Sequence, residues 1–494
     1  MQLAPALFPD RAPLTLHAPG AMLLVLPCVL LMKTNQHYDR GWWWIAIGGA
    51  AMVVLLAGCA GTRTAGEKAA RKNQQTIQKV YRPGGQRPTL PTLTANSSLS
   101  DFLLFAMLSQ PRVEAAYYDW AAAVERIAVE RSLPDPRLTF QTDIAGMVTS
   151  LMPGFMTDFP GRGKLKAAAN IATAESEAKY FAFESSVLQT AFALKKAAYQ
   201  LKFLDARIGV THQMLRLMGE MEKLALIRFE VGKVTLQDVL RARIEQERLF
   251  TSNANLNDSR QPVLAQFKAS LGLKAEDATP PVPNKLETTP LDLTAEMLFT
   301  TALARNPRLK AMEAEVRLAE ASLGLAAKSK VPDFSAGIMA DVKAFPVMVR
   351  PSLGVTLPIW RDKIAAQIAG AQAGKRAAEA RLSAEQIALA VEFAEKSFMF
   401  REASRNLELL NERLLTMTKQ SLEVAQSGYA GGNVDFLNVI DAERTLLDFQ
   451  LSEVEARLQR ELALAELSLL ILGVPPANAP VLPPNAARGM EIHP

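Results

Sequence analysis

The chain has 494 residues, of which 49% are hydrophobic and 7% aromatic. Its 2 cysteines exclude a disulfide scaffold and cysteine-rich zinc or iron–sulfur sites. The 4 histidines never stand four residues apart, so we expect no histidine-rich metal site. Lys and Arg (55) nearly balance Asp and Glu (50), and this net charge of +5 makes no case for nucleic-acid binding.

The N-terminal segment has the features of an export signal. Residues 41–58 are uncharged and mostly apolar, and Lys33 and Arg40 precede them. The run Leu56-Ala57-Gly58-Cys59 resembles a bacterial lipobox, in which the cysteine becomes the lipidated N-terminus. An acyl chain tethers a protein to a membrane at ~0.8 kcal/mol per buried methylene. We therefore predict lipidation of Cys59, the alternative being a single membrane-spanning helix that ends near Gly58.

The second cysteine, Cys28, follows a shorter apolar run whose flank is poor for cleavage. We expect translation to begin at Met32 rather than Met1, with residues 1–31 as an upstream extension. Sequencing of the precursor would reject this start if it began at Met1. Residues 59–96 are polar and contain three prolines, so we predict an extended, lipid-anchored linker there.

The rest of the chain contains two copies of one unit. Pairs of short motifs recur in the same order and at nearly constant separation, which isolated chance matches would not do. The clearest pairs are Gln110-Pro111-Arg112 with Asn306-Pro307-Arg308, Leu133-Pro134-Asp135 with Val331-Pro332-Asp333, and Phe229–Val234 with Tyr429–Val434. We predict six segments: signal and extension 1–58, linker 59–96, first repeat 97–278, linker 279–294, second repeat 295–474 and a proline-rich tail 475–494.

Each repeat is predicted to contain the same elements in the same order. These are a helix (about 101–131 and 295–329), two strands (about 137–148 and 153–160, then 333–343 and 346–358), a very long helix (about 165–228 and 363–428) and, after a glycine turn, a return helix (about 234–271 and 435–472).

The predicted strands have one apolar and one polar face. Phe334, Ile338 and Val342 alternate with Asp333, Ser335 and Asp341. A soluble sheet that covers a core would show the same pattern. Export of the chain and strands of 10–12 residues favour a membrane. Four strands cannot close a barrel, whereas three copies would supply twelve.

The long helices must project from any compact body. About 64 residues of helix span roughly 96 Å. Their apolar residues recur at spacings of three, four or seven, as Ala197, Leu201, Leu204 and Ile208 illustrate, which is typical of a coiled-coil seam. Met214, Met218 and Met221 suggest either soft-metal ligands or core packing, and we favour core packing.

The duplicated plan resembles the TolC-type outer-membrane efflux proteins, in particular their lipid-anchored branch. The resemblance covers about residues 97–475 and is strongest at Phe229-x-x-Gly232-x-Val234 and Tyr429-x-x-Gly432-x-Val434. It implies a mainly α fold in which a homotrimer forms a helical tunnel continuous with a shared twelve-stranded barrel. It also implies an exit duct in the outer membrane that serves a periplasmic adaptor and an inner-membrane pump of the RND type.

The resemblance also assigns roles to single residues. The turns at the periplasmic tip would contact the adaptor, unless they are plain hairpin ends; their residues are Val231, Gly232, Lys233, Gly431, Gly432 and Asn433. Tyr429 and Asp238 match links that hold the tip shut, and Asp441 matches an aspartate ring, the alternative being an ordinary solvated residue on a helix. Gln237, Val434 and Asn438 depart from the family pattern at this gate.

No motif for nucleophilic, phosphate or zinc chemistry occurs in the sequence, so we expect neither an enzyme nor a cofactor. The alternative function is a periplasmic helical lipoprotein with a structural or adaptor role and no pore. The exported substrate and the particular pump do not follow from the sequence.

Overall fold

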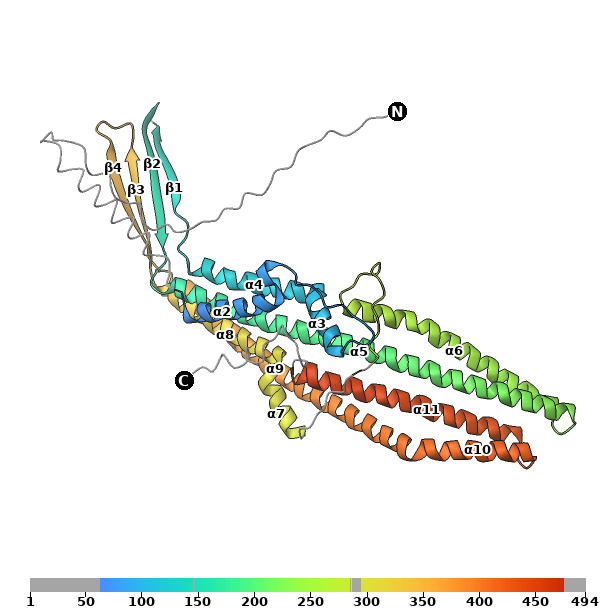
Figure 1. Cartoon of the computed structure of the whole chain (residues 1–494). Helices are drawn as coiled ribbons and strands as arrows, with labels where there is room; N and C mark the ends of the chain where they lie inside the picture. The colour runs from blue at the N-terminus through green and yellow to red at the C-terminus, as the bar shows by residue number, and fades with distance from the viewer. Residues whose placement is uncertain (1–62, 145–146, 285, 287–294, 475–494) are drawn as a thin grey trace, which may run out of the picture. The chain divides into compact units, whose positions relative to one another are not determined.

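The computed structural model describes residues 63–144, 147–284, 286 and 295–474. The chain divides into two units, Met1–Cys59 and Ala60–Pro494, and all described residues lie in the second. The predictions for Cys59 and for the signal segment therefore fall outside the described residues. Within the described ranges the protein is mainly helical with one small sheet (Figure 1).

The two predicted repeats appear as two runs of matching elements. The first contains α3 (Leu99–Ser109), α4 (Pro111–Arg131), β1 (Arg137–Ile144), β2 (Val148–Phe159), α5 (Lys164–Glu230) and α6 (Leu236–Ser270). The second contains α7 (Ala295–Arg305), α8 (Pro307–Ala327), β3 (Asp333–Asp341), β4 (Met348–Thr356), α9 (Arg361–Leu409), α10 (Leu415–Gly431) and α11 (Phe436–Ala465). Short π-helical turns follow α9 at Leu410–Leu414 and α11 at Glu466–Ile471.

The prediction of one continuous helix at the start of each repeat is wrong. The helices break at Gln110 and Asn306, whose ψ angles are 118° and 122°. Each of these residues precedes a proline, and the proline ring excludes helical ψ from the residue before it. Pro111 and Pro307 then start new helices, where their missing N–H costs nothing.

The prediction of an extended segment over 59–96 is also wrong. Helix α2 occupies Ala65–Tyr81, and the Thr64 hydroxyl caps its N-terminus by accepting a hydrogen bond from the Glu67 backbone. Ile77 and Tyr81 are fully buried against α4 and α5. The prolines that suggested extension all follow the helix.

The same joint closes both repeats. At the end of α6, Gly272 (φ 73°) lies against the backbone of Ser109 and Gln110, and the Ser109 hydroxyl donates to the Leu271 carbonyl oxygen (2.6 Å). Past α11, Gly473 (φ 63°) lies in the same way against the α7–α8 break. The motifs that reveal the duplication therefore hold the first break and the last turn of each repeat together.

The four strands form one antiparallel sheet in the order β1-β2-β3-β4. Leu138 pairs with Phe155, and Phe155 pairs with Ile338, so the apolar residues of neighbouring strands share a face, as predicted. Leu138 is 67% exposed and Leu353 is 87% exposed, so nothing in the described part of the chain covers that face. The β1–β2 turn comes earlier than predicted: β2 starts at Val148 rather than at 153.

Helix α5 is the central element of the helical part. Its 67 residues extend over about 100 Å, and it packs against α4, α6 and α8. The largest core cluster surrounds its first half and is rich in aromatic rings, including Trp120 and Phe183. Within the described ranges, no helix is both long enough and apolar enough to cross a membrane.

Candidate functional site

The predicted tip lies where α5 and α10 reverse direction, at the end of the helices away from the sheet (Figure 1). In the first turn, Gly232 adopts φ 69° and its N–H donates to the Phe229 carbonyl oxygen (2.9 Å). The Lys233 N–H donates to the Arg228 carbonyl oxygen (2.8 Å). Only glycine enters this left-handed conformation without strain, and the paired hydrogen bonds satisfy the last carbonyls of α5.

The second turn repeats this geometry. Gly432 has φ 80°, its N–H donates to Tyr429 (3.0 Å), and the Asn433 N–H donates to Gly428 (2.9 Å). All six predicted contact residues are exposed on the single chain. The structure thus brings two nearly identical, solvent-facing turns to one end of the molecule.

The four helices that carry the turns share one apolar cluster. Its members come from α5, α6, α10 and α11 and include Met214, Met218, Met221, Val239, Leu422, Tyr429, Phe436 and Ile440. The three methionines are buried in this cluster, in agreement with core packing. Among the described residues, no group of three or more His, Cys, Asp or Glu side chains is placed to hold a metal ion.

Arg228 joins the two turns and was not predicted from the sequence. Its guanidinium carbon lies 4.6 Å from the centre of the Tyr429 ring, which is 2% exposed and also contacts Phe436. A methyl group added to Gly432 would lie 3.3 Å from an Arg228 nitrogen. A cation over an aromatic face is attracted by about 1–2 kcal/mol when desolvated. The first hairpin is therefore fastened to the second at the tip.

The structure brings Asp238 and Tyr429 near each other without a hydrogen bond between them. The Asp238 carboxylate instead caps α6, accepting from the Thr235 backbone N–H (3.3 Å) and hydroxyl (3.4 Å). The Tyr429 hydroxyl is buried with no hydrogen-bond partner among the described residues. Burial raises the pKa of this phenol, Arg228 lowers it and Asp238 raises it slightly.

The remaining predicted gate positions lie on α6, on α11 and in the turn before α11. Asp441 is exposed, and its backbone carbonyl accepts from the Thr445 hydroxyl (2.7 Å). Val434 lies over Gly428, where an added methyl group would be only 2.5 Å from it. Gln237 and Asn438 are exposed. An aspartate ring needs further copies of the chain, so the role of Asp441 stays a prediction.

Two buried carboxyl groups lie about two to three helical turns from the starts of α6 and α11. Glu245 is 5% exposed and pairs with Arg444 (2.6 Å). Glu443, from α11, is 1% exposed. Burial raises the pKa of Glu443 to about 8, Glu245 adds to the rise, and Gln426 opposes it. This buried pair was not predicted from the sequence, because a glutamate on a helix is usually solvated.

We expect the substitution Glu443→Gln to stabilise the protein in alkaline solution. Folding raises the pKa of Glu443 from 4.5 to about 8, so the native state loses stability as the pH rises through this range. Glutamine removes this loss, so the stability of the variant relative to the native chain should rise by about 4 kcal/mol between pH 5 and pH 8.5. Urea unfolding at both pH values measures the gain. The matched control is Glu247→Gln, an exposed position on α6, and an equal gain there would contradict the explanation.

The fold and the paired turns define a duplicated protein class: two strand hairpins in one sheet, each continued by a long helical hairpin. Residues 298–473 match the family model described as outer membrane efflux protein. The predicted resemblance to this family is thereby confirmed for the second repeat by sequence.

A relative with an established name is the cobalt-zinc-cadmium resistance protein CzcC of Cupriavidus metallidurans. It is 26% identical over 230 residues, which cover 44% of this chain and 52% of the relative. The aligned part thus spans about half of that relative's length.

Solved structures share the fold. The outer membrane protein VceC of Vibrio cholerae has a TM-score of 0.63 at 19% identity, covering 75% of this chain and 95% of its own. The open state of the outer membrane channel MtrE of Neisseria gonorrhoeae also has a TM-score of 0.63, at 16% identity, covering 78% of this chain and 94% of its own. At these identities the likeness confirms the mainly α fold with its small sheet.

Proposed function

We propose that three copies of this chain form an outer-membrane exit duct that conducts substrates passively from an inner-membrane pump to the cell exterior. The observation that carries the proposal is the sheet: its four strands leave a continuous apolar face exposed. Lipid tolerates strands only when no edge is left unpaired, and twelve strands from three copies would meet this demand. The long helices would form the periplasmic tunnel, and Cys59 would carry a lipid anchor.

The exposed turns support a partner at the opposite end. We propose that Val231-Gly232-Lys233 and Gly431-Gly432-Asn433 contact a periplasmic adaptor, which connects the duct to a pump of the RND type. Glycine leaves the backbone of each turn accessible to such a partner. The name of the CzcC relative makes divalent metal cations our first candidate cargo.

Conductance in planar bilayers tests the duct. Purified full-length chain should form discrete channels, and unboiled samples should migrate as a heat-sensitive trimer in detergent gels. A soluble monomer without conductance would overturn the proposal in favour of a structural lipoprotein.

We further propose that the contact between Arg228 and Tyr429 holds the tip closed. Loss of about 1 kcal/mol in each of three subunits would shift the closed-to-open ratio roughly 100-fold. Arg228→Ala should therefore raise the open fraction in single-channel records, whereas Tyr429→Phe should not, because the hydroxyl makes no hydrogen bond. Arg216→Ala, at an exposed position on α5, is the control. An effect of Tyr429→Phe equal to that of Arg228→Ala would favour a latch through Asp238.

The proposed Asp441 ring predicts a different phenotype. Clustered carboxylates attract cations, so Asp441→Ala should weaken block by divalent cations without altering the open fraction. Unchanged block would leave Asp441 as a solvated residue of α11.

A further inference from the structure

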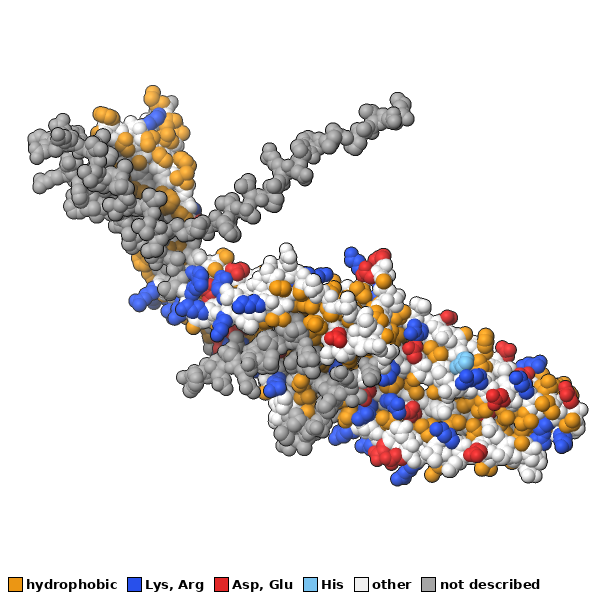
Figure 2. Space-filling view, in the orientation of Figure 1, with side chains coloured by type: hydrophobic (Ala, Val, Ile, Leu, Met, Phe, Trp, Pro, Cys, Tyr) orange, Lys and Arg blue, Asp and Glu red, His pale blue; other side chains and the backbone are white. Residues whose placement is uncertain are grey.

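Unpaired cations gather where the sheet meets the helices. Figure 2 shows Lys and Arg side chains gathered at the base of the sheet. Six exposed residues at three of the strand–helix junctions define this basic collar: Arg162, Lys166, Lys328, Lys330, Arg361 and Lys363. None of the six forms an ion pair with any other described residue.

Asp362, exposed between Arg361 and Lys363, offsets one of these charges, whereas two other nearby acidic residues are engaged elsewhere. Asp158 pairs with Arg137, and Asp333 pairs with Lys164 (2.7 Å) while accepting from the Gly161 N–H (2.6 Å). The collar therefore keeps an excess of free positive charge.

Exposed apolar side chains adjoin the collar directly. Leu357, Ile359 and Trp360 are 65%, 64% and 71% exposed and immediately precede Arg361. Phe334 is 50% exposed and stands four residues after Lys330. These two junctions thus pass from exposed apolar side chains to cations within a few residues. This is the order in which acyl chains give way to phosphates in a bilayer.

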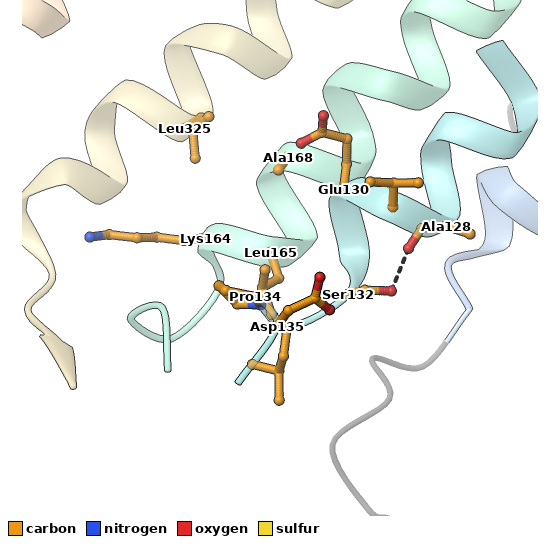
Figure 3. A pocket seen from close by; sticks show the side chains of 11 residues that line it. Ala128, Glu130, Ser132, Pro134, Asp135, Lys164, Leu165, Ala168 and Leu325 are labelled. Carbon is orange, nitrogen blue, oxygen red and sulfur yellow. Dashed lines mark hydrogen bonds between the residues drawn. The ribbon is translucent and has the colours of Figure 1, made fainter. Parts of the chain in front are cut away.

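A neighbouring hollow does not combine unpaired cations with apolar side chains. It has a volume of about 660 Å³ and lies between the end of α4 and the start of α5 (Figure 3). Leu165, Ala168 and Leu325 line it, together with Lys164, which already pairs with Asp333, and the carboxylates Glu130 and Asp135. These two carboxylates repel an anion, so the exposed cations are the better phosphate site.

We propose that the basic collar binds the phosphate groups of anionic phospholipids at the membrane surface, an inference that rests on the proposed insertion of the strands. A Lys or Arg at an anionic membrane surface contributes roughly fivefold to affinity. A free phosphate ion would use only the cations, whereas a lipid also contacts the exposed strand face. The collar would fix the depth at which the sheet sits in the membrane.

Lipid retention by the full-length trimer tests the collar. The probe is phosphatidylglycerol at a set mole fraction in detergent micelles at 0.15 M salt, with phosphatidylcholine as the uncharged comparison. The quadruple variant Lys328→Gln, Lys330→Gln, Arg361→Gln, Lys363→Gln should retain phosphatidylglycerol at least tenfold less than the native chain, with no change for phosphatidylcholine. The control variant removes four exposed cations near the other end: Arg216→Gln, Lys223→Gln, Arg413→Gln, Lys419→Gln.

Three results would overturn the inference. They are unchanged retention in the collar variant, an equal fall in the control variant, or complete displacement of the lipid by millimolar inorganic phosphate. Conductance of the same samples separates the two proposals. If the protein conducts but its lipid retention does not change with the collar substitutions, only the collar proposal is refuted. If the protein neither conducts nor retains lipid, the duct proposal is refuted.

Discussion

The substitution Asn306→Ala should lower the free energy of unfolding by about 3 kcal/mol relative to the native chain. The Asn306 side chain is fully buried, and its amide oxygen accepts from the N–H groups of Arg308 (2.8 Å) and Leu309 (3.4 Å) at the start of α8. Its amide nitrogen donates to the carbonyl oxygens of Leu470 and Ile471, both at 3.0 Å. Alanine would leave these four backbone groups without partners, largely shielded from water.

The first repeat supplies the matched control. The amide nitrogen of Gln110 donates to Ala269 (3.0 Å) and Ser270 (3.3 Å), but its side chain caps no helix and is only half-buried. Gln110→Ala should therefore cost about 1 kcal/mol. Urea unfolding followed by far-ultraviolet circular dichroism, at equal protein and detergent concentrations, compares the two. Equal losses would show that the N-terminal cap of α8 contributes nothing.

Gly272→Val should destabilise the first repeat by at least about 4 kcal/mol. A methyl group added to Gly272 would lie 2.8 Å from the Gln110 Cα and 2.9 Å from the Ser109 carbonyl oxygen, and both are backbone atoms that cannot turn aside. The φ of 73° is strained for any residue with a side chain and most strained for a β-branched one. Limited proteolysis and urea unfolding should both report a loosened α6.

The same substitution at Gly209 is the control for Gly272→Val. Gly209 lies within α5, has an ordinary helical φ, and an added methyl group would meet nothing within 4 Å. Gly209→Val should change stability by about 0.5 kcal/mol or less. If Gly272→Val yields no folded protein, Gly272→Ala is the second variant. Stability of Gly272→Ala equal to that of the native chain would refute the predicted strain.

The sequence predicted the architecture because the duplication repeats every signal. Gly232 and Gly432 mark equivalent turns. Apolar and polar residues alternate along β3, and the register of the sheet places the apolar residues of neighbouring strands on one face. The sequence did not predict the breaks at Gln110 and Asn306, because the motifs there mark the repeat as well as a helix boundary. Helix α2 was missed because the segment is polar overall and buries only a narrow stripe.

The backbone turns of the candidate site could be predicted from the sequence, but its side-chain contacts could not. The glycine that allows a helix to reverse direction lies at the reversal itself, so both turns could be located from the sequence. Arg228 and Glu443 have roles only because separate helices meet around them. Charged residues on a helix surface give no signal of such burial. The roles of Asp238, Tyr429 and Asp441 in gating, and the domain boundaries, remain predictions.

The joints at Gly272 and Gly473 bear on the order in which the chain folds. They connect positions 159 to 162 residues apart in the first repeat and 164 to 165 residues apart in the second. Closing such long loops is slow, and neither repeat can close before its last helix has emerged. The first repeat can therefore close before the second is complete. Because of the duplication, the chain closes two shorter loops one after the other during folding, rather than one very long loop.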